Sequence, residues 1–209
     1  MSNLEDDDDP PHLSAESLAA LNEFLLEQKN NQQDDSKSFS EDWELSQFWY
    51  DEETTQFLAD SLIKTINGNG VIGCISCPTV YIKLLSMIKE NDKYSDVQVY
   101  LLEFDQRFAR LGPNFVFYDY RDPLAVKEVL SSSFFDIIVC DPPFLSEECL
   151  TKVTETINYL KKEKIILNTG AIQSNLVDKL LQLKPSSTFI PRHKNNLANQ
   201  FACFSNFPI

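Results

Sequence analysis

The chain has 209 residues, a formal net charge of −14 at neutral pH and 43% apolar residues. This length suits one domain with an extension, and the apolar fraction is enough for a sizeable core. The acidic charge argues against a protein that grips DNA or RNA over a broad basic surface, and it suits a basic protein partner.

No segment resembles a secretory signal, because residues 1–12 are acidic and lack an apolar core. No apolar run approaches the length that spans a membrane. The five cysteines are an odd number for a disulfide framework, so we expect reduced thiols and a cytoplasmic location.

Residues 1–40 differ in composition from the rest and are predicted to form an acidic N-terminal extension. They hold ten acidic and two basic residues, a formal charge of −8 out of −14. A leucine stripe predicts a short amphipathic helix over Ser14–Gln28, and the polar residues 30–40 are typical of a linker. The helix is interpreted either as a loosely attached appendage or as a docking element for a protein partner.

Residues 41–209 are predicted to form the main domain, which opens with the aromatic cluster EDWELSQFWY at residues 41–50. Core packing and a place in the lining of a cofactor pocket explain this cluster equally well. Because it lies just before the first strand, we favour the second interpretation for Trp49 and Tyr50. A helix over Glu52–Ile66 follows, with Asp51 as its N-cap.

The first strand is predicted at Val71–Cys77 and is followed by a helix over Thr79–Lys89. Between them, Ser76, Cys77 and Pro78 occupy the loop where a nucleotide would approach, and backbone N–H groups at the helix start can meet it. No glycine-rich loop stands here. Cys74 and Cys77 form an isolated C-x-x-C pair, which indicates strand-end packing rather than a metal site.

The next two strands are predicted at Val97–Phe104 and Phe115–Tyr120, and both end in acids. An acid one βα unit after the first strand accepts the ribose hydroxyls in nucleoside-binding folds, which assigns that role to Glu103 beside Phe104. Asp105 is the competing candidate. Asp119 and Tyr120 end the third strand, where an acid is placed to bond an adenine amino group.

The apolar run Phe135–Cys140 predicts a strand buried on both faces, and it is followed by Asp141, Pro142, Pro143 and Phe144. Two prolines cannot continue a central strand, so the strand ends in a carboxylate, a stiff bend and an aromatic ring. Ligands of open α/β sheets bind beyond such strand ends. The alternative is a plain Asp-Pro turn that ends a core strand.

The remaining elements complete an α/β fold with a seven-stranded, mostly parallel sheet and helices on both faces. After a short helix at Pro123–Leu130, the later helices are predicted at Ser146–Leu160 and Gln173–Leu183, with a fifth strand at Lys164–Leu167 between them. Ser187–Arg192 and Gln200–Phe207 are predicted to pair as a C-terminal antiparallel hairpin. Arg192, His193 and Lys194 are either solvated loop charges or contacts to a substrate.

Asp141–Phe144 resembles the DPP[FY] motif of amino-methyltransferases, which transfer a methyl group from S-adenosylmethionine to nitrogen atoms. Separated segments, among them LSQFWYDEET, LEFDQRF, FVFYDY, NTGAI and PRHKNNLANQF, further resemble the eukaryotic elongation factor 1-alpha lysine methyltransferase family. This resemblance spans nearly the whole chain. It implies a class I, Rossmann-like methyltransferase fold, S-adenosylmethionine as donor with S-adenosylhomocysteine as product, and a lysine ε-amine as target.

The resemblance also implies a division of the site. Asp141 and a carbonyl of the proline bend would orient the amine, while Phe144, with Trp49 or Tyr50, would wall the pocket. From the residues themselves we expect no metal and no nucleic-acid or membrane partner, and we expect a monomer. The predicted catalytic residues are thus Asp141, Pro142, Pro143 and Phe144, and the predicted cofactor residues are Trp49, Tyr50, Ser76, Cys77, Pro78, Glu103, Phe104, Asp119, Tyr120 and Asp141.

Two other functions stay open. An N6-adenine nucleic-acid methyltransferase would use the same DPPF motif to hold a flipped base, but the chain lacks a basic groove and a target-recognition insertion. A binding module that keeps the fold without catalysis is the other alternative.

Overall fold

The computed structural model describes residues 39–45, 47–195 and 197–209, without the side chain of Trp43. The predicted helix Ser14–Gln28 lies outside these residues, and the division of the chain at residue 40 stays a prediction. No helix in the described part of the chain is long and apolar enough to cross a membrane.

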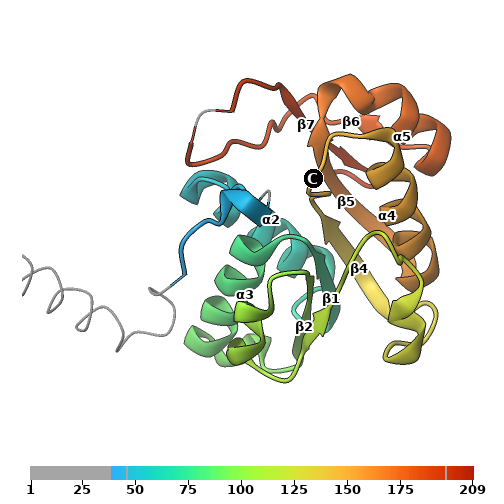
Figure 1. Ribbon diagram of the computed structural model, residues 1–209. Coiled ribbons are helices and arrows are strands. Elements are labelled where there is room, and N and C mark those ends of the chain that lie inside the picture. The colour runs from blue at the N-terminus through green and yellow to red at the C-terminus, as the bar shows by residue number, and fades with distance from the viewer. Residues whose placement is uncertain (1–38, 46, 196) are drawn as a thin grey trace, which may run out of the picture. The chain divides into compact units, whose positions relative to one another are not determined.

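A seven-stranded sheet organises residues 70–205 (Figure 1). Its order is β3-β2-β1-β4-β5-β7-β6, with β1 to β5 parallel and β7 antiparallel to both β5 and β6. This is the strand order of class I methyltransferases, so the predicted fold is confirmed. The strands are β1 (Gly70–Ile75), β2 (Val97–Glu103), β3 (Phe115–Phe117), β4 (Phe135–Cys140), β5 (Lys161–Gly170), β6 (Lys184–Pro185) and β7 (Phe201–Ser205).

Helices cover both faces of the sheet. Figure 1 shows α2 (Glu52–Thr65) and α3 (Pro78–Glu90) on one face and α4 (Glu147–Leu160) and α5 (Ser174–Leu181) on the other. The predicted N-cap of α2 is confirmed, because the Asp51 carboxylate accepts the backbone N–H of Thr54 at 2.8 Å. Short 3₁₀ turns occupy Trp43–Leu45, Asp92–Tyr94, Gln106–Leu111, Ala125–Glu128 and Ala171–Gln173.

The core is built around β4, which the sequence predicted as a strand buried on both faces. Five of its residues are buried, and Asp136 is half-buried. Phe135 packs against the neighbouring strand at Gly73, where a Cβ atom would come within 2.6 Å of the ring. A glycine at this point of β1 therefore makes room for the largest side chain of β4.

Several predicted boundaries are wrong by a few residues. The first strand ends at Ile75 instead of Cys77, because Ser76 turns into the left-handed region with φ 54°. The third strand covers Phe115–Phe117 only, and the short helix predicted at Pro123–Leu130 is a 3₁₀ turn. The fifth strand is longer than predicted.

The prediction of a strand at Ser187–Arg192 is wrong. The partner of β7 is β6, and the chain then turns at Ser186, whose hydroxyl accepts the backbone N–H of Thr188. The following residues pack against the start of α2. Phe189 stacks on Phe57 with ring centroids 4.0 Å apart, and the N–H of Arg192 donates to Thr54 Oγ1 at 2.9 Å. The backbone donors of this segment are therefore used outside the sheet.

Candidate active site

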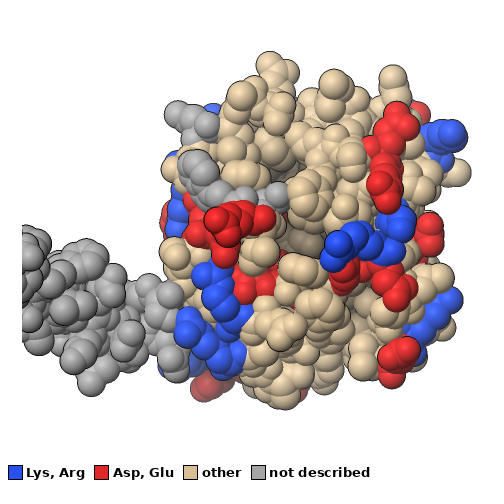
Figure 2. Space-filling model, viewed as in Figure 1, with Lys and Arg blue, Asp and Glu red and all other residues tan. Residues whose placement is uncertain are grey.

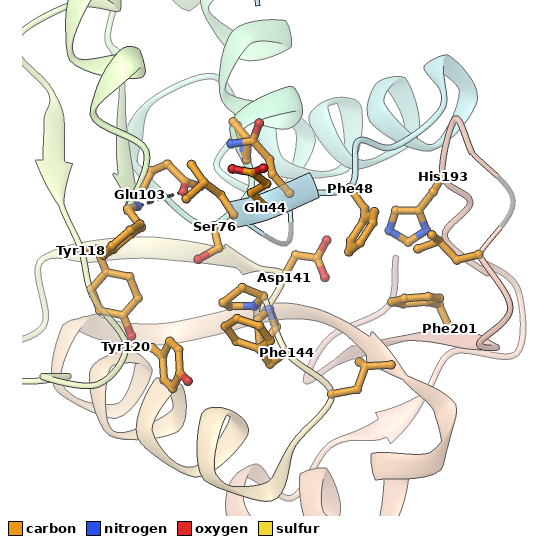
Figure 3. Close-up of a pocket in the computed structure, with 18 of the residues that line it drawn as sticks. Glu44, Phe48, Ser76, Glu103, Tyr118, Tyr120, Asp141, Phe144, His193 and Phe201 are labelled. Atoms are coloured by element: carbon orange, nitrogen blue, oxygen red, sulfur yellow. Dashed lines mark hydrogen bonds between the residues drawn. The ribbon is translucent and has the colours of Figure 1, made fainter. Parts of the chain in front are cut away.

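A cavity of about 580 Å³ opens at the carboxyl edge of the sheet. This volume is within the range of small-molecule sites. Figure 2 shows a hollow on this face, with uncharged side chains on its floor and acidic and basic side chains at its edges. The residues at the ends of β1, β2, β3 and β4 all contribute to the lining. Other segments add Glu44, Gln47 and Phe48, and His193, Leu197 and Phe201 (Figure 3).

Glu103, at the end of β2, lines the cavity and is 8% exposed. One of its oxygens accepts the backbone N–H groups of Phe104 and Asp105, at 2.9 and 3.2 Å. These two bonds fix the carboxylate in the cavity wall (Figure 3). Burial raises the pKa of Glu103 to about 7, against the effect of the two backbone donors.

Asp105, the competing candidate for the ribose, has other partners. Arg107 forms a bidentate pair with its carboxylate, in which Nη2 donates to Oδ2 at 2.7 Å and Nε donates to Oδ1 at 3.0 Å. The carboxylate also accepts Gln47 Nε2 at 3.3 Å. Arg107 holds the pKa of Asp105 below its usual value despite partial burial. Asp105 is absent from the described lining of the cavity, so the geometry favours Glu103 as the residue available to a ligand.

Asp119 and Tyr120 both line the cavity, beyond the end of β3. The Asp119 carboxylate forms a bidentate pair with Arg121, at 2.6 and 2.9 Å, which lowers its pKa. Tyr120 lies across from Phe144, with ring centroids 5.7 Å apart. Phe104, at 42% exposure, completes an aromatic wall on this side.

The loop after β1 replaces the glycine-rich turn that many nucleotide sites use. Ser76 adopts φ 54°, a conformation that favours glycine, and donates its backbone N–H to the carbonyl of Leu102 at 2.9 Å. Ser76 and Pro78 line the cavity, whereas the Cys77 side chain is buried and only caps α3 through its backbone position.

The DPPF segment reaches the centre of the cavity. All four residues, Asp141 to Phe144, line it, and the backbone N–H of Asp141 continues the sheet by donating to the carbonyl of Ile75 at 3.1 Å. Burial, together with charge repulsion from Glu103, raises the pKa of Asp141 to about 7. Two acids that resist ionisation together in one cavity are suited to binding a cation.

Trp49 and Tyr50 do not line the cavity among the described residues. Trp49 is 9% exposed and donates its indole N–H to Gln47 Oε1 at 3.1 Å. Tyr50 is 2% exposed, and its hydroxyl oxygen accepts a hydrogen bond from Asn168 Nδ2 at 3.0 Å. The assignment of Trp49 and Tyr50 as cofactor contacts stays a prediction. In the structure, both side chains contact residues that surround the cavity.

Aromatic residues gather on the other side of Asp141. Phe48, His193 and Phe201 line this part of the cavity, and Figure 3 shows them facing Asp141. The rings of His193 and Phe201 lie 4.5 Å apart. Burial lowers the pKa of His193, so this wall is uncharged at neutral pH. Arg192, His193 and Lys194 were predicted either as solvated loop charges or as contacts to a substrate. Of these three, His193 lines the cavity.

A family model described as "Probable N6-adenine methyltransferase" matches residues 41–209. EEF1A lysine methyltransferase 1 of Homo sapiens is 46% identical over an alignment of 213 positions that covers 99% of this chain and 96% of the relative. The Gallus gallus protein of the same name is 47% identical over 97% of both chains. Protein-lysine N-methyltransferase EFM5 of Saccharomyces cerevisiae is 34% identical over 93% of this chain and 91% of the relative.

The chain belongs to the EEF1A lysine methyltransferase 1 family. The resemblance inferred from the separated sequence segments is thereby confirmed. Members of this family need a methyl donor, and the residues in the cavity fit S-adenosylmethionine. The buried acid Glu103 is placed to accept ribose hydroxyls, and the aromatic wall of Phe104 and Tyr120 is suited to pack against a purine. Glu103 and Asp141, whose pKa values are raised, are suited to a positively charged sulfonium.

Sequence reasoning missed several residues of the site. Phe48 stood in the predicted aromatic cluster, but its neighbours were chosen instead. Phe201 was assigned only to a strand, and Leu197 to Asn199 only to a loop. Composition and periodicity carry no signal for these positions, because their places depend on tertiary contacts such as those of Phe189 and Arg192 with α2. The described residues contain no group of three or more potential metal ligands, and the expectation of no metal stays a prediction.

Proposed function

We propose that this protein transfers a methyl group from S-adenosylmethionine to a lysine ε-amine of translation elongation factor 1-alpha. The names of the relatives carry the choice of substrate. The observation that carries the chemistry is the position of Asp141, which lies between the nucleoside side of the cavity and an uncharged aromatic wall.

The nucleoside side would hold the cofactor. Glu103 would accept the ribose hydroxyls, while Phe104 and Tyr120 would flank the adenine and Asp119 its amino group. When bound, S-adenosylmethionine supplies a methyl group on a sulfonium ion. The raised pKa values of Glu103 and Asp141, both about 7, fall when a positive charge enters the cavity.

The amine side would select and orient the lysine. A lysine ammonium has a pKa of about 10.4 in water and is not nucleophilic until it loses a proton. The uncharged wall of Phe48, His193 and Phe201 disfavours the ammonium and lowers that pKa. The Asp141 carboxylate and a carbonyl of the Pro142-Pro143 bend would then accept the remaining N–H groups and aim the lone pair. Alignment of this kind supplies much of the rate in such displacements.

The test is transfer of labelled methyl groups from S-adenosylmethionine to separate samples of elongation factor 1-alpha, DNA and RNA. We expect label only in the protein, and we expect Asp141→Ala to abolish it with an unchanged circular dichroism spectrum. Label in nucleic acid would support the N6-adenine alternative instead. No transfer to any sample would support a binding module, and near-wild-type transfer by Asp141→Ala would overturn the role of the motif.

We further propose that the protein acts as a monomer in the cytoplasm. In support, the cavity combines residues from four consecutive strand ends of one chain, and all five cysteines are free thiols, as suits a reducing compartment. Light scattering after size-exclusion chromatography tests the first statement, and cell fractionation tests the second.

A further inference from the structure

A second cleft, of about 640 Å³, adjoins the cavity at its amine side. Four residues line both spaces, namely His193, Leu197, Asn199 and Phe201. His193 and Phe201 belong to the aromatic wall that faces Asp141, and their rings lie 4.5 Å apart (Figure 3). The acids that would hold the nucleoside are absent from the described lining of the second cleft. The two spaces therefore meet where the target amine would bind.

The start of β7, at Phe201, lies in the lining of the second cleft and at an open edge of the sheet. Strand β6 pairs only with the last two residues of β7. Ser186 then donates its backbone N–H to the carbonyl of Cys203 at 2.7 Å, and beyond it the chain leaves the sheet for the start of α2. Among the described residues, no strand pairs with the outer edge of β7 at Phe201.

The backbone N–H and C=O of Phe201 face this open edge. Ala171 donates its backbone N–H to the carbonyl of Gln200 at 2.8 Å, so the backbone of Gln200 faces β5. Successive residues of an antiparallel strand direct their bonding groups to alternate sides. Phe201 and Cys203 therefore face the other side, which agrees with the bond from Ser186 to Cys203. An unpaired edge of this kind can accept a further extended chain.

The chemistry of the second cleft suits a peptide better than a nucleic acid. Its charged lining residues in the described part of the chain are Asp51 and Arg192, beside a His193 whose pKa is lowered by burial. A phosphate backbone would thus meet one cation, which is too few for a strong grip. Ile190 also lines the cleft and is 66% exposed. The cleft therefore offers apolar burial to a side chain and hydrogen bonds to a backbone, as sites for extended peptides do.

We propose that the second cleft binds the segment of the protein substrate that carries the target lysine, in an extended conformation along the outer edge of β7. This inference rests on the proposed function. A lysine amine lies at the end of a flexible four-carbon stem, so the backbone that carries it can stay outside the cavity while the amine lies inside. The lysine side chain would reach Asp141 past His193 and Phe201, which line both spaces. The residues on either side of the lysine would then decide which lysine is methylated.

Ile190→Asp tests the second cleft without changing the cavity, because Ile190 is absent from the described lining of the cavity. We expect the KM for elongation factor 1-alpha to rise about tenfold or more, since the variant removes apolar contact and adds a charge that binding would bury. The kcat and the affinity for S-adenosylmethionine should change less than about threefold, as for a residue that contributes only to binding.

The matched control is Val129→Asp. Val129 is 65% exposed, close to the 66% of Ile190, and it lines neither space. Both variants place the same charge on an exposed β-branched position, so their general effects on stability and on long-range charge are alike. The control should leave the KM within about twofold of the wild type. Equal KM values in Ile190→Asp and Val129→Asp would overturn the proposal.

A photo-crosslinking residue, p-benzoylphenylalanine, at position 190 shows where the substrate lies. Mass spectrometry should find its crosslinks on the segment of elongation factor 1-alpha that contains the methylated lysine, and none from the same residue at position 129. Crosslinks to a different segment, or none, would overturn the proposal. Hydrogen exchange at the backbone N–H of Phe201 should also slow when the substrate is bound, and unchanged exchange would overturn the pairing with β7.

The outcomes separate this proposal from the proposed function. A wild-type protein that does not methylate elongation factor 1-alpha refutes the proposed function. A wild-type protein that methylates it, with a KM that Ile190→Asp leaves unchanged, refutes only the docking of the substrate in the second cleft.

Discussion

Glu103 Oε1 accepts the backbone N–H of Asp105 at 3.2 Å, so two acids that are neighbours in the sequence have separate roles. The bond turns the Glu103 carboxylate into the cavity wall, while Asp105 turns to Arg107 and Gln47. Glu103 is thus the acid that is available to a ligand, and Asp105 is the acid that stabilises the fold.

Glu103→Ala should weaken the binding of S-adenosylmethionine more than it lowers the maximal rate. Hydrogen bonds to a charged group contribute about 1.5–3 kcal/mol, which corresponds to a loss of about one to two orders of magnitude in affinity. Isothermal titration calorimetry measures this change, and Glu155→Ala, an exposed acid of α4, is the control. Unchanged affinity in Glu103→Ala would remove the ribose role from this residue.

Asp141→Asn should abolish methyl transfer. At pH 8 it should also stabilise the cofactor-free protein against unfolding. The pKa of Asp141 is about 7 in the folded protein, above the ordinary value of 3.8. As the pH rises from about 4 to about 7, Asp141 ionises in the unfolded chain but stays protonated in the folded protein. The wild type therefore loses folding stability over this range, whereas the asparagine variant keeps it. We expect a gain of roughly 2–4 kcal/mol at pH 8 and little difference at pH 4.

Urea unfolding of both proteins at the two pH values measures the gain. Glu103 and His193 are present in both proteins, so their own titrations largely cancel in the comparison. A variant that is less stable than the wild type at pH 8 would contradict the prediction, since it would mean that burial does not penalise the Asp141 charge.

Asp119→Ala should lower the affinity for S-adenosylmethionine by about tenfold, if its carboxylate holds the adenine amino group. Arg121→Ala should change affinity less than about threefold. It should also cost less than about 1 kcal/mol in stability, because the Asp119–Arg121 pair is exposed at the arginine. Competition binding with a labelled cofactor compares the two variants. Equal losses in both would assign the contact to the ion pair instead of to Asp119.

Deletion of residues 1–38 should leave cofactor binding intact, because the described lining of the cavity begins at Glu44. Those residues carry more than half of the net negative charge, and an acidic arm speeds the encounter with a basic partner. The KM for the protein substrate should therefore rise at low salt and change little at high salt, where charges are screened. Loss of cofactor binding on deletion would show that the extension is part of the fold.

The central parallel strands were predictable because each is a short apolar run that ends in a turn signal. Phe135–Cys140 was located to the residue, since the two prolines after Asp141 leave one place for the strand to end. Ser187–Arg192 was not predictable as a loop. It contains β-branched and aromatic residues, Thr188, Phe189 and Ile190, which favour a strand, and only the contacts of Phe189 with Phe57 and of Arg192 with Thr54 show where it packs.

The candidate site divides in the same way. Glu103, Asp119 and Asp141 follow parallel strands, so topology alone brings them to one edge of the sheet. Phe48 and Phe201 reach the cavity from opposite ends of the domain sequence. Contacts between segments so far apart depend on tertiary packing, for which local patterns carry no signal.

Residues 47–50 contact both halves of the site. Gln47 donates to Asp105, beside the acid that would hold the ribose, and Phe48 lines the cavity beside Asp141, the acid that would hold the amine (Figure 3). Part of the binding energy of the nucleoside is therefore available to order the Asp141 side of the cavity, where the lysine amine would bind. A methyl donor that lacks the adenosine part should then react slowly even when it saturates the protein, because the recognition of one end of the cofactor helps to arrange the reaction at the other.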